Sequence, residues 1–185
     1  LEIEMEPGEM TISRAITVVG LGPGRWEDLT IEARDALAAA SVVICRTLRH
    51  PTVDALQAWR PELRIESFDQ LYETSESFAD LYPEMARQLV ERAASLPEGE
   101  ALLYAVPGHP LMGEESVRIL RQEAVAKGVR VDVVAGLSFV EPVCAALDLN
   151  PLERDLQLID ATALAATPAE AVMGMSFDQR TIDSR

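Results

Sequence analysis

Alternating strand and helix signals run along most of this chain of 185 residues and constrain its fold more than any other feature. Short β-branched or apolar runs are followed by segments whose apolar residues recur at helical spacing. Parallel strands need such crossover helices, which then cover both faces of the sheet. We therefore predict an α/β fold with a mostly parallel sheet. The expected strands are residues 16–19, 41–45, 63–68, 101–106 and 129–134, and the expected helices are 29–40, 82–93, 114–127 and 139–147.

Three segments are expected along the chain. Residues 1–14 form an acidic tail, 15–150 form the α/β domain, and 151–185 begin a second α/β domain that is largely missing. Asn150 and Pro151 give a turn signal at the boundary. A short strand at 156–160 would open the last segment. The length fits one domain, or one domain and part of another.

Acidic residues outnumber basic ones by 31 to 16, which gives a formal net charge of −15. Such a chain repels phosphate backbones and anionic membranes, so neither nucleic acid nor a membrane is an expected partner. The apolar runs are too short to cross a bilayer. Cys45 and Cys144 lie far apart and outside any CxxC pair, which favours a reducing, cytoplasmic location. The first ten residues carry four glutamates and no basic residue, unlike a secretory signal.

Gly20, Gly22 and Gly24 follow the first expected strand. Glycines at the carboxyl end of a strand let the backbone turn tightly and approach a ligand closely. A nicotinamide site needs GxGxxG and an acidic residue after the second strand, whereas this chain has GxGxG and, there, Cys45 and Arg46. A P-loop is also excluded, because no Gly-Lys-Ser/Thr sequence follows. The loop is therefore either a ligand-binding loop or a tight turn without a ligand.

A second loop, residues 107–113, contains two prolines and two glycines. It follows a strongly apolar strand and precedes a helix, so its main-chain groups are well placed to hold a ligand. His109 in this loop suggests acid–base chemistry or a metal ligand. The chain has only two histidines, however, and no Cys or Asp cluster at ligand spacing near either. A turn histidine, or one that lines a pocket without titrating, is the better interpretation, and no metal site is predicted.

Residues 135–142 form a third loop. A hydrolase nucleophile elbow needs GxSxG, but Val140 stands where the second glycine would be. Ser138 is predicted to cap the following helix, with Glu141 three residues later completing a capping box. Capping does not exclude ligand binding, because the hydroxyl lies at the edge of the sheet where a ligand would sit.

Acidic residues gather between residues 66 and 80. The ExxE spacing of Glu73 and Glu76 suits magnesium, but no second acidic pair at matching spacing is evident. A solvated acidic face is the better interpretation. Trp26 and Trp59 are expected to serve packing rather than cofactor stacking.

Taken in order, the three loops resemble the tetrapyrrole (corrin/porphyrin) methylase family. The resemblance rests on VVGLGP at 18–23, YAVPGHPLMG at 104–113 and GLSFVEP at 136–142, with TLRHP at 47–51 and FDQLYET at 68–74 adding to it. From about residue 16 to residue 160 the chain is similar to the methylase-like domain found N-terminal to MazG-type nucleotide pyrophosphohydrolases. Family members continue well beyond residue 160, so the chain is expected to be truncated.

The resemblance implies an enzyme that binds S-adenosyl-L-methionine in a cleft between two α/β domains and releases S-adenosyl-L-homocysteine. It also implies a homodimer and a small-molecule substrate such as a tetrapyrrole. Methyl transfer from a sulfonium relies on orientation and a partly dry pocket, so no catalytic side chain is assigned. The family commonly has Asp where this chain has His109. By analogy, the cofactor-binding residues are Leu21, Gly22, Gly108, His109, Pro110, Met112, Gly113, Ser138 and Phe139.

Three functions are weighed against one another. The first is an S-adenosylmethionine-dependent methyltransferase that works by in-line displacement, active or inactive as a fragment. The alternative is a non-catalytic ligand-binding or dimerisation module associated with a nucleotide pyrophosphohydrolase. The third, a nicotinamide-dependent oxidoreductase, is opposed by the glycine spacing and by Arg46 after the second strand.

Overall fold

A five-stranded sheet crosses the described part of the chain, which comprises residues 14–153, 156 and 158 of this computed structural model. The strand order is β3-β2-β4-β1-β5, and every neighbouring pair is parallel. The mostly parallel sheet predicted from the sequence is confirmed. The strands are β1 (Ala15–Gly20), β2 (Val42–Cys45), β3 (Arg64–Ser67), β4 (Ala101–Val106) and β5 (Arg130–Val134).

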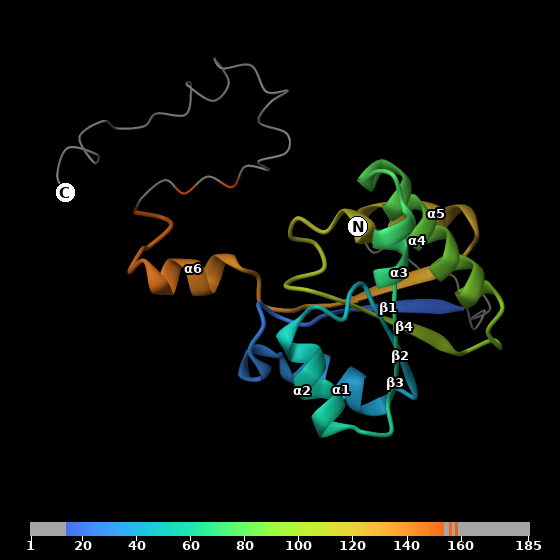
Figure 1. The fold of residues 1–185 in the computed structure, drawn as a ribbon, viewed down its shortest axis with the longest axis horizontal. Helices are drawn as coiled ribbons and strands as arrows, with labels where there is room; N and C mark the ends of the chain where they lie inside the picture. Colours follow the sequence, from blue (N-terminus) through green and yellow to red (C-terminus); the bar gives the residue numbers. More distant parts are fainter. Residues whose placement is uncertain (1–13, 154–155, 157, 159–185) are drawn as a thin grey trace, which may run out of the picture. The chain divides into compact units, whose positions relative to one another are not determined.

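Helices cover both faces of the sheet, as Figure 1 shows. α1 and α2 lie on one face, and α3, α4 and α5 lie on the other. The helices are α1 (Ile31–Ala39), α2 (Pro51–Trp59), α3 (Asp69–Thr74), α4 (Phe78–Ala94), α5 (Glu115–Ala126) and α6 (Val140–Ala146), with a short 3-10 turn, η1, at Trp26–Asp28.

The two faces of β4 explain how the core is divided. Tyr104 is fully buried in the cluster formed with α4 and α5, whereas Leu103 and Ala105 belong to the cluster formed with α1 and α2. Successive side chains of a strand point to opposite faces, and here both faces are covered. The run at 101–106 is therefore continuously apolar rather than alternating, as expected for a central parallel strand.

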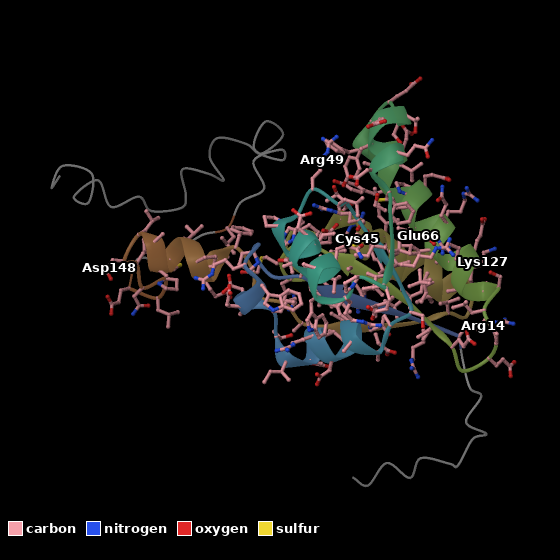
Figure 2. The ribbon with its side chains drawn as sticks, turned by 60° about the horizontal axis from the view of Figure 1, so that its bottom comes forward. Arg14, Cys45, Arg49, Glu66, Lys127 and Asp148 are labelled. Atoms are coloured by element: carbon pink, nitrogen blue, oxygen red, sulfur yellow. The ribbon has the colours of Figure 1, made fainter. Side chains whose placement is uncertain are left out.

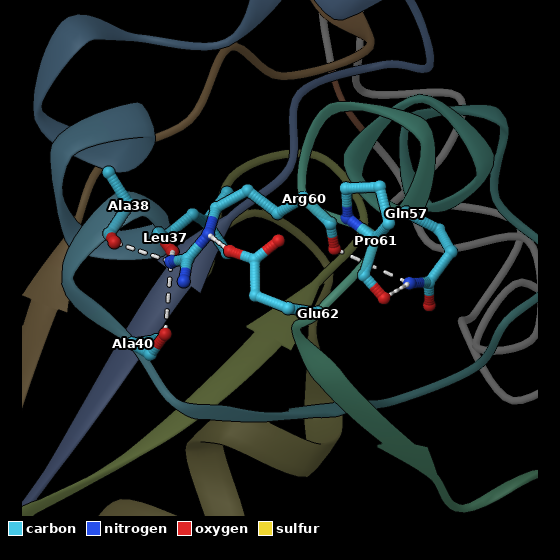
Figure 3. A network of polar contacts seen from close by, with 7 residues as sticks. All are labelled: Leu37, Ala38, Ala40, Gln57, Arg60, Pro61 and Glu62. Atoms are coloured by element: carbon cyan, nitrogen blue, oxygen red, sulfur yellow. Dashed lines mark hydrogen bonds and ion pairs between the residues drawn. The ribbon is translucent and has the colours of Figure 1, made fainter.

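Side chains satisfy the free backbone groups at both ends of α1. At its start, Thr30 Oγ1 accepts a hydrogen bond from the N–H of Ala33 at 3.1 Å. At its end, the carbonyl groups of the last turn have no partner within the helix. The Arg60 guanidinium fills this role, and Figure 3 shows it donating to the carbonyl oxygens of Leu37, Ala38 and Ala40.

The sequence interpretation missed α2 and α3 and placed the start of α4 at residue 82 instead of Phe78. α2 is as long as α1, which was predicted, but one of its three buried residues is the polar Thr52, so its apolar periodicity is weaker. Pro51 at its first position was the available signal, because proline fits the start of a helix. α3 has six residues and buries none of them. α4 begins earlier because Ser77 caps it by accepting from the N–H of Asp80.

Backbone contacts divide the chain into two units, Leu1–Leu147 and Asp148–Arg185. All the helices and strands named above lie in the first unit. The predicted acidic tail, apart from Arg14, lies outside the described residues, as does the predicted strand at 156–160, apart from 156 and 158. Over the described residues, no helix is long and apolar enough to span a membrane.

Candidate functional site

The chain leaves two neighbouring strands, β1 and β4, in opposite directions. It passes from β1 to β2 on one side of this pair and from β4 to β5 on the other. In open parallel sheets such a change of direction leaves a crevice beyond the carboxyl ends of the strands, where ligands bind. In Figure 2, Arg14 and Lys127 mark the edge at which strands begin, so the loops that follow the strands lie at the opposite edge. The glycine loops after β1 and β4 meet at this edge of the sheet.

Main-chain hydrogen bonds join the first loop to the second. The N–H of Leu21 donates to the carbonyl of Val106 at 2.8 Å, which extends the pairing of β1 with β4. Gly22 and Gly108 then form an antiparallel bridge, with N–H to O distances of 3.2 Å from Gly22 and 2.8 Å from Gly108. Both glycines have positive φ angles, 70° and 66°, which glycine adopts with little strain. The two loops are therefore held as one main-chain unit.

The third loop meets the other two at a contact between glycines. A Cβ atom built on Gly20 would lie 2.6 Å from the carbonyl oxygen of Gly108 and 2.6 Å from the nitrogen of Gly136. A Cβ atom on Gly136 would lie 2.9 Å from the Cα of Gly20 and would also overlap the Gly108 carbonyl. These distances are below those of real Cβ contacts, so the loops can approach this closely only because neither residue has a side chain.

Two threonine hydroxyls connect helices to these loops. Thr30, the cap of α1, donates from Oγ1 to the carbonyl of Ala135 in the third loop at 2.9 Å. Thr52, fully buried in the first turn of α2, donates to the carbonyl of Leu21 at 3.2 Å. Each helix start is thereby linked to one loop of the crevice. Neither contact was expected from the sequence, because the partners are 105 and 31 residues apart.

The predicted residues of the first loop are buried. The Leu21 side chain is 0% exposed and belongs to the core cluster shared with α1 and α2, and Gly22 is also buried. The N–H and carbonyl groups of Leu21 are both engaged, as described above. This loop therefore shapes the crevice with its backbone. Direct contact of Leu21 with a cofactor stays a prediction.

The second loop exposes apolar side chains from a backbone fixed by local hydrogen bonds. His109 accepts the N–H of Leu111 on Nδ1 at 3.0 Å, and its carbonyl accepts the N–H of Met112 at 3.0 Å. Leu111 and Met112 are 54% and 39% exposed, whereas Pro110 is buried. Gly113 ends the loop with a φ of 65°. Of the predicted residues here, His109 and Met112 are the side chains that remain accessible.

In the third loop, Ser138 is committed to local hydrogen bonds. Its Oγ donates to the Glu141 carboxylate at 2.7 Å and accepts the N–H of Val140 at 3.0 Å. The hydrogen bond from Ser138 lowers the pKa of the Glu141 carboxyl. The predicted partnership of Ser138 with Glu141 is confirmed, but α6 begins at Val140 and Phe139, not Ser138, is the residue before it. The Phe139 side chain is 53% exposed.

An ion pair between a buried carboxylate and a partly buried guanidinium connects the end of the second loop to the loop after β2. Glu114 lies directly before α5, and its side chain is 3% exposed. Arg46, directly after β2, donates to its Oε2 at 2.7 Å. Ser116 donates to the other carboxylate oxygen at 2.7 Å. This pair was not expected from the sequence, because the partners are 68 residues apart and only tertiary folding brings them together.

Asp69 holds the rest of the loop after β2. Its carboxylate accepts hydrogen bonds from Thr47 Oγ1 at 2.5 Å, the N–H of Leu48 at 2.8 Å and Ser67 Oγ at 2.9 Å. Burial raises the pKa of Asp69, but these hydrogen bonds outweigh it and hold the pKa below the usual value. Asp69 is thus a structural acceptor rather than part of a solvated acidic face. The contact joins the segments 47–51 and 68–74, which the sequence singled out separately.

Burial shifts the pKa values of two titratable groups, Cys45 and His50. Burial, together with the charge of Asp69, raises the pKa of the Cys45 thiol to about 12, so the thiol stays protonated at neutral pH. Burial also lowers the pKa of His50, with the charge of Arg46 adding to the effect and a backbone hydrogen bond to Gly22 opposing it. Among the described residues, no three His, Cys, Asp or Glu side chains are arranged to hold a metal ion.

Comparison with known proteins finds one matching family and two similar proteins. The sequence profile of tetrapyrrole (corrin/porphyrin) methylases matches residues 15–174. "Uncharacterized protein YabN" of Bacillus subtilis (strain 168) is 35% identical over 170 residues, covering 90% of this chain and 33% of YabN. Uroporphyrinogen-III C-methyltransferase of Cyanidium caldarium is 29% identical over 147 residues, covering 77% of this chain and 53% of that protein.

A solved structure shows the same fold. Uroporphyrin-III C-methyltransferase from Thermus thermophilus superposes with a TM-score of 0.53 at 23% identity, covering 75% of this chain and 54% of that chain. The chain belongs to the tetrapyrrole (corrin/porphyrin) methylase family, which confirms the resemblance of its loops. It spans between a third and about half of the length of the curated relatives named above.

Proposed function

We propose that this protein is an S-adenosylmethionine-dependent methyltransferase of the tetrapyrrole methylase class, acting on a small-molecule acceptor. Family membership supports the class of reaction. The observation that carries the proposal is the contact between Gly20, Gly108 and Gly136. It brings the three loops that resemble the family to one crevice at the carboxyl edge of the sheet, where a ligand of an open α/β fold would bind.

The side chains exposed on these loops suit this cofactor. Leu111, Met112, Leu137 and Phe139 are 39% to 54% exposed and entirely apolar. Apolar and aromatic groups line most small-molecule sites and pack well against an adenine ring. His109 accepts a hydrogen bond on Nδ1, which leaves Nε2 as the ring nitrogen that can donate. Apolar surface with few polar groups fits a nucleoside that carries an aliphatic chain.

The contribution of the chain is orientation and exclusion of water. Bound S-adenosylmethionine supplies a methyl group already activated by the positive charge of its sulfonium. The glycine contact gives this edge of the sheet a closely packed backbone, and Met112 and Phe139 offer exposed apolar surface on the neighbouring loops. Holding the reactants in line in a partly dry site supplies much of the rate enhancement in reactions of this kind. The bond from Ser138 to Glu141 keeps the residues before α6, including Phe139, in place.

Calorimetric titration with S-adenosyl-L-homocysteine tests the proposal. We expect micromolar binding, about −8 kcal/mol, and no binding of NADH. Met112→Ala and Phe139→Ala should each weaken binding about tenfold, because each removes apolar contact area. Val125→Ala is the matched control, since Val125 is an apolar residue on α5 that is 80% exposed. A folded wild-type chain that does not bind S-adenosyl-L-homocysteine would contradict the proposal.

The same resemblance supports three finer proposals. We infer that the protein is cytoplasmic and a homodimer, and that it is associated with a MazG-type nucleotide pyrophosphohydrolase. Sedimentation equilibrium tests the dimer, and co-purification tests the association. The methyl acceptor is tested separately, by incubation with radiolabelled S-adenosylmethionine and tetrapyrroles. Cofactor binding without methyl transfer would favour the alternative, a non-catalytic ligand-binding module.

A further inference from the structure

The loop formed by residues 107–113 ends at a buried charge. Within the described range, Glu114 is the only charged residue that is buried, and its side chain is 3% exposed. One carboxylate oxygen accepts from Arg46 and the other from Ser116, both at 2.7 Å. Both oxygens of the carboxylate are therefore engaged, and the carboxylate cannot swing away without leaving two donors unpaired.

The network around Glu114 extends into the sheet. Ser116 Oγ lies 2.8 Å from the hydroxyl of Tyr104, a fully buried residue of β4. The backbone N–H of Arg46 donates to the carbonyl of Ala105 on the same strand at 2.9 Å. Burial lowers the pKa of Arg46, but the charge of Glu114, the nearby hydroxyls of Tyr72 and Tyr104 and the hydrogen bond to Glu114 together raise it above its usual value, so the guanidinium remains charged. Arg46 is thus fixed to β4 through its backbone and to the end of the second loop through its side chain.

An ion pair with a buried partner is a poor source of stability. Removing two charges from water costs several kcal/mol per ion, and apolar replacements of similar size are often as stable or more so. What the pair does supply is a fixed geometry, because both oxygens of the Glu114 carboxylate find their donors only in this arrangement. Here that arrangement holds the segment that connects the exposed Leu111 and Met112 to α5.

We propose that Arg46 and Glu114 are positioning residues that hold the 107–113 loop in the shape that binds the cofactor. This inference rests on the proposed function, since the loop is assigned there to the cofactor. Neither side chain needs to touch the ligand. Arg46 acts through Glu114, and Glu114 acts through the backbone of Gly113 and Met112. The loop after β2 thereby becomes part of the site although it contributes no predicted cofactor contact.

Four variants separate positioning from stability. Arg46→Met and Glu114→Gln each break the pair, and Arg46→Met combined with Glu114→Gln leaves no unpaired charge in the interior. Arg46→Lys keeps the positive charge. Arg87→Met combined with Glu84→Gln is the matched control, because that pair lies at the surface of α4. Each variant is measured for Tm, for amide hydrogen exchange without ligand, and for affinity to S-adenosyl-L-homocysteine.

We expect the double variant to recover thermal stability without recovering the position of the loop. The double variant at 46 and 114 should regain much of the Tm lost in the single variants, because no buried charge is left alone. The amides of Leu111 and Met112 should nevertheless exchange about tenfold faster than in the wild type, and affinity should be about tenfold weaker. Arg46→Lys should lie closer to the wild type in both measurements. The control pair should change neither.

The exchange measurement also separates this inference from the proposed function. If the wild type does not bind S-adenosyl-L-homocysteine, the proposed function fails, and exchange at Leu111 and Met112 still decides whether the pair positions the loop. Wild-type exchange and affinity in the double variant would overturn the inference, because the loop would then hold its shape without the pair. Faster exchange spread evenly over the core strands would also overturn it, because the effect would be general destabilisation.

Discussion

Replacing Gly20 by alanine tests the contact on which the site depends. The new Cβ atom would lie 2.6 Å from the carbonyl oxygen of Gly108 and 2.6 and 2.8 Å from the nitrogen and Cα of Gly136. All three atoms are backbone atoms, and they belong to two different loops. No side-chain rotation can relieve the overlap, so the second or third loop must move away from β1.

The cost follows from this geometry. Overpacking a core by one carbon typically costs about 1–3 kcal/mol when neighbouring side chains can adjust. Here only backbone can adjust, and moving it would disturb the bridge between Gly22 and Gly108, so we expect a loss near the upper end, about 3 kcal/mol. For a domain of this size, such a loss lowers Tm by about 10 °C.

Chemical denaturation of Gly20→Ala, beside Gly113→Ala, gives the measurement. Gly113 has a φ of 65°, but a Cβ atom added there would meet no other atom within 4 Å, so its replacement carries backbone strain alone. That strain is about 1 kcal/mol. The reasoning is refuted if Gly20→Ala is no less stable than Gly113→Ala, because the steric contribution would then be absent.

Three further changes test the contacts that fix the loops. Thr30→Val removes the hydrogen bonds to Ala33 and Ala135, so chemical denaturation should show a free energy of unfolding about 1–2 kcal/mol lower. The control is Thr74→Val, whose exposed hydroxyl contacts the carbonyl of Gln70, and an equal loss in this variant would contradict the prediction. Asp69→Asn offers one accepting oxygen instead of two to its three donors, so unfolding at neutral pH should require about 2 kcal/mol less, with exposed Asp35→Asn as control. The folded-state pKa of Asp69 is below 3.8, so the ionised carboxylate stabilises the fold above pH 3.8, and this stabilisation is lost as pH falls through the folded-state pKa. If the free energy of unfolding of the wild type and of Asp69→Asn changed in parallel with pH, this prediction would be wrong. The folded-state pKa of His50 is below 6.5, so the unfolded chain binds a proton first and wild-type stability should fall as pH drops below 6.5. His50→Gln should make stability less dependent on pH in this range. Equal slopes of stability against pH in the two proteins would refute the prediction.

Much of the fold was predictable because buried segments have a recognisable local pattern of apolar residues. The five expected strands are all present, within one residue of their predicted ends, since short apolar runs between turn signals reflect strands buried on both faces. Gly128 after α5 has the positive φ expected of a residue that ends a helix. Two helices lack this pattern. α2 includes the polar Thr52 among its three buried residues, and α3 buries none of its six residues, so neither shows a clear apolar periodicity.

The site was predictable in its parts but not in its assembly. The three loops were recognised as unusual, because glycine and proline are informative about backbone shape at single positions. The structure added that Leu21 is buried and that Ser138 is bound to Glu141, which leaves Met112 and Phe139 as the accessible predicted apolar side chains. It also added the roles of Asp69 and of the pair of Arg46 with Glu114, since charged residues are common in any sequence and only their burial and partners distinguish these.

The sequence by itself determined that the strands are buried and parallel, and that the glycine loops follow them at one edge of the sheet. These properties depend on local periodicity and on the geometry of parallel connections. Only the tertiary structure decided that β1 lies between β4 and β5, which is what brings Gly20, Gly108 and Gly136 together. Strand order depends on packing between segments about a hundred residues apart, and no single segment encodes it.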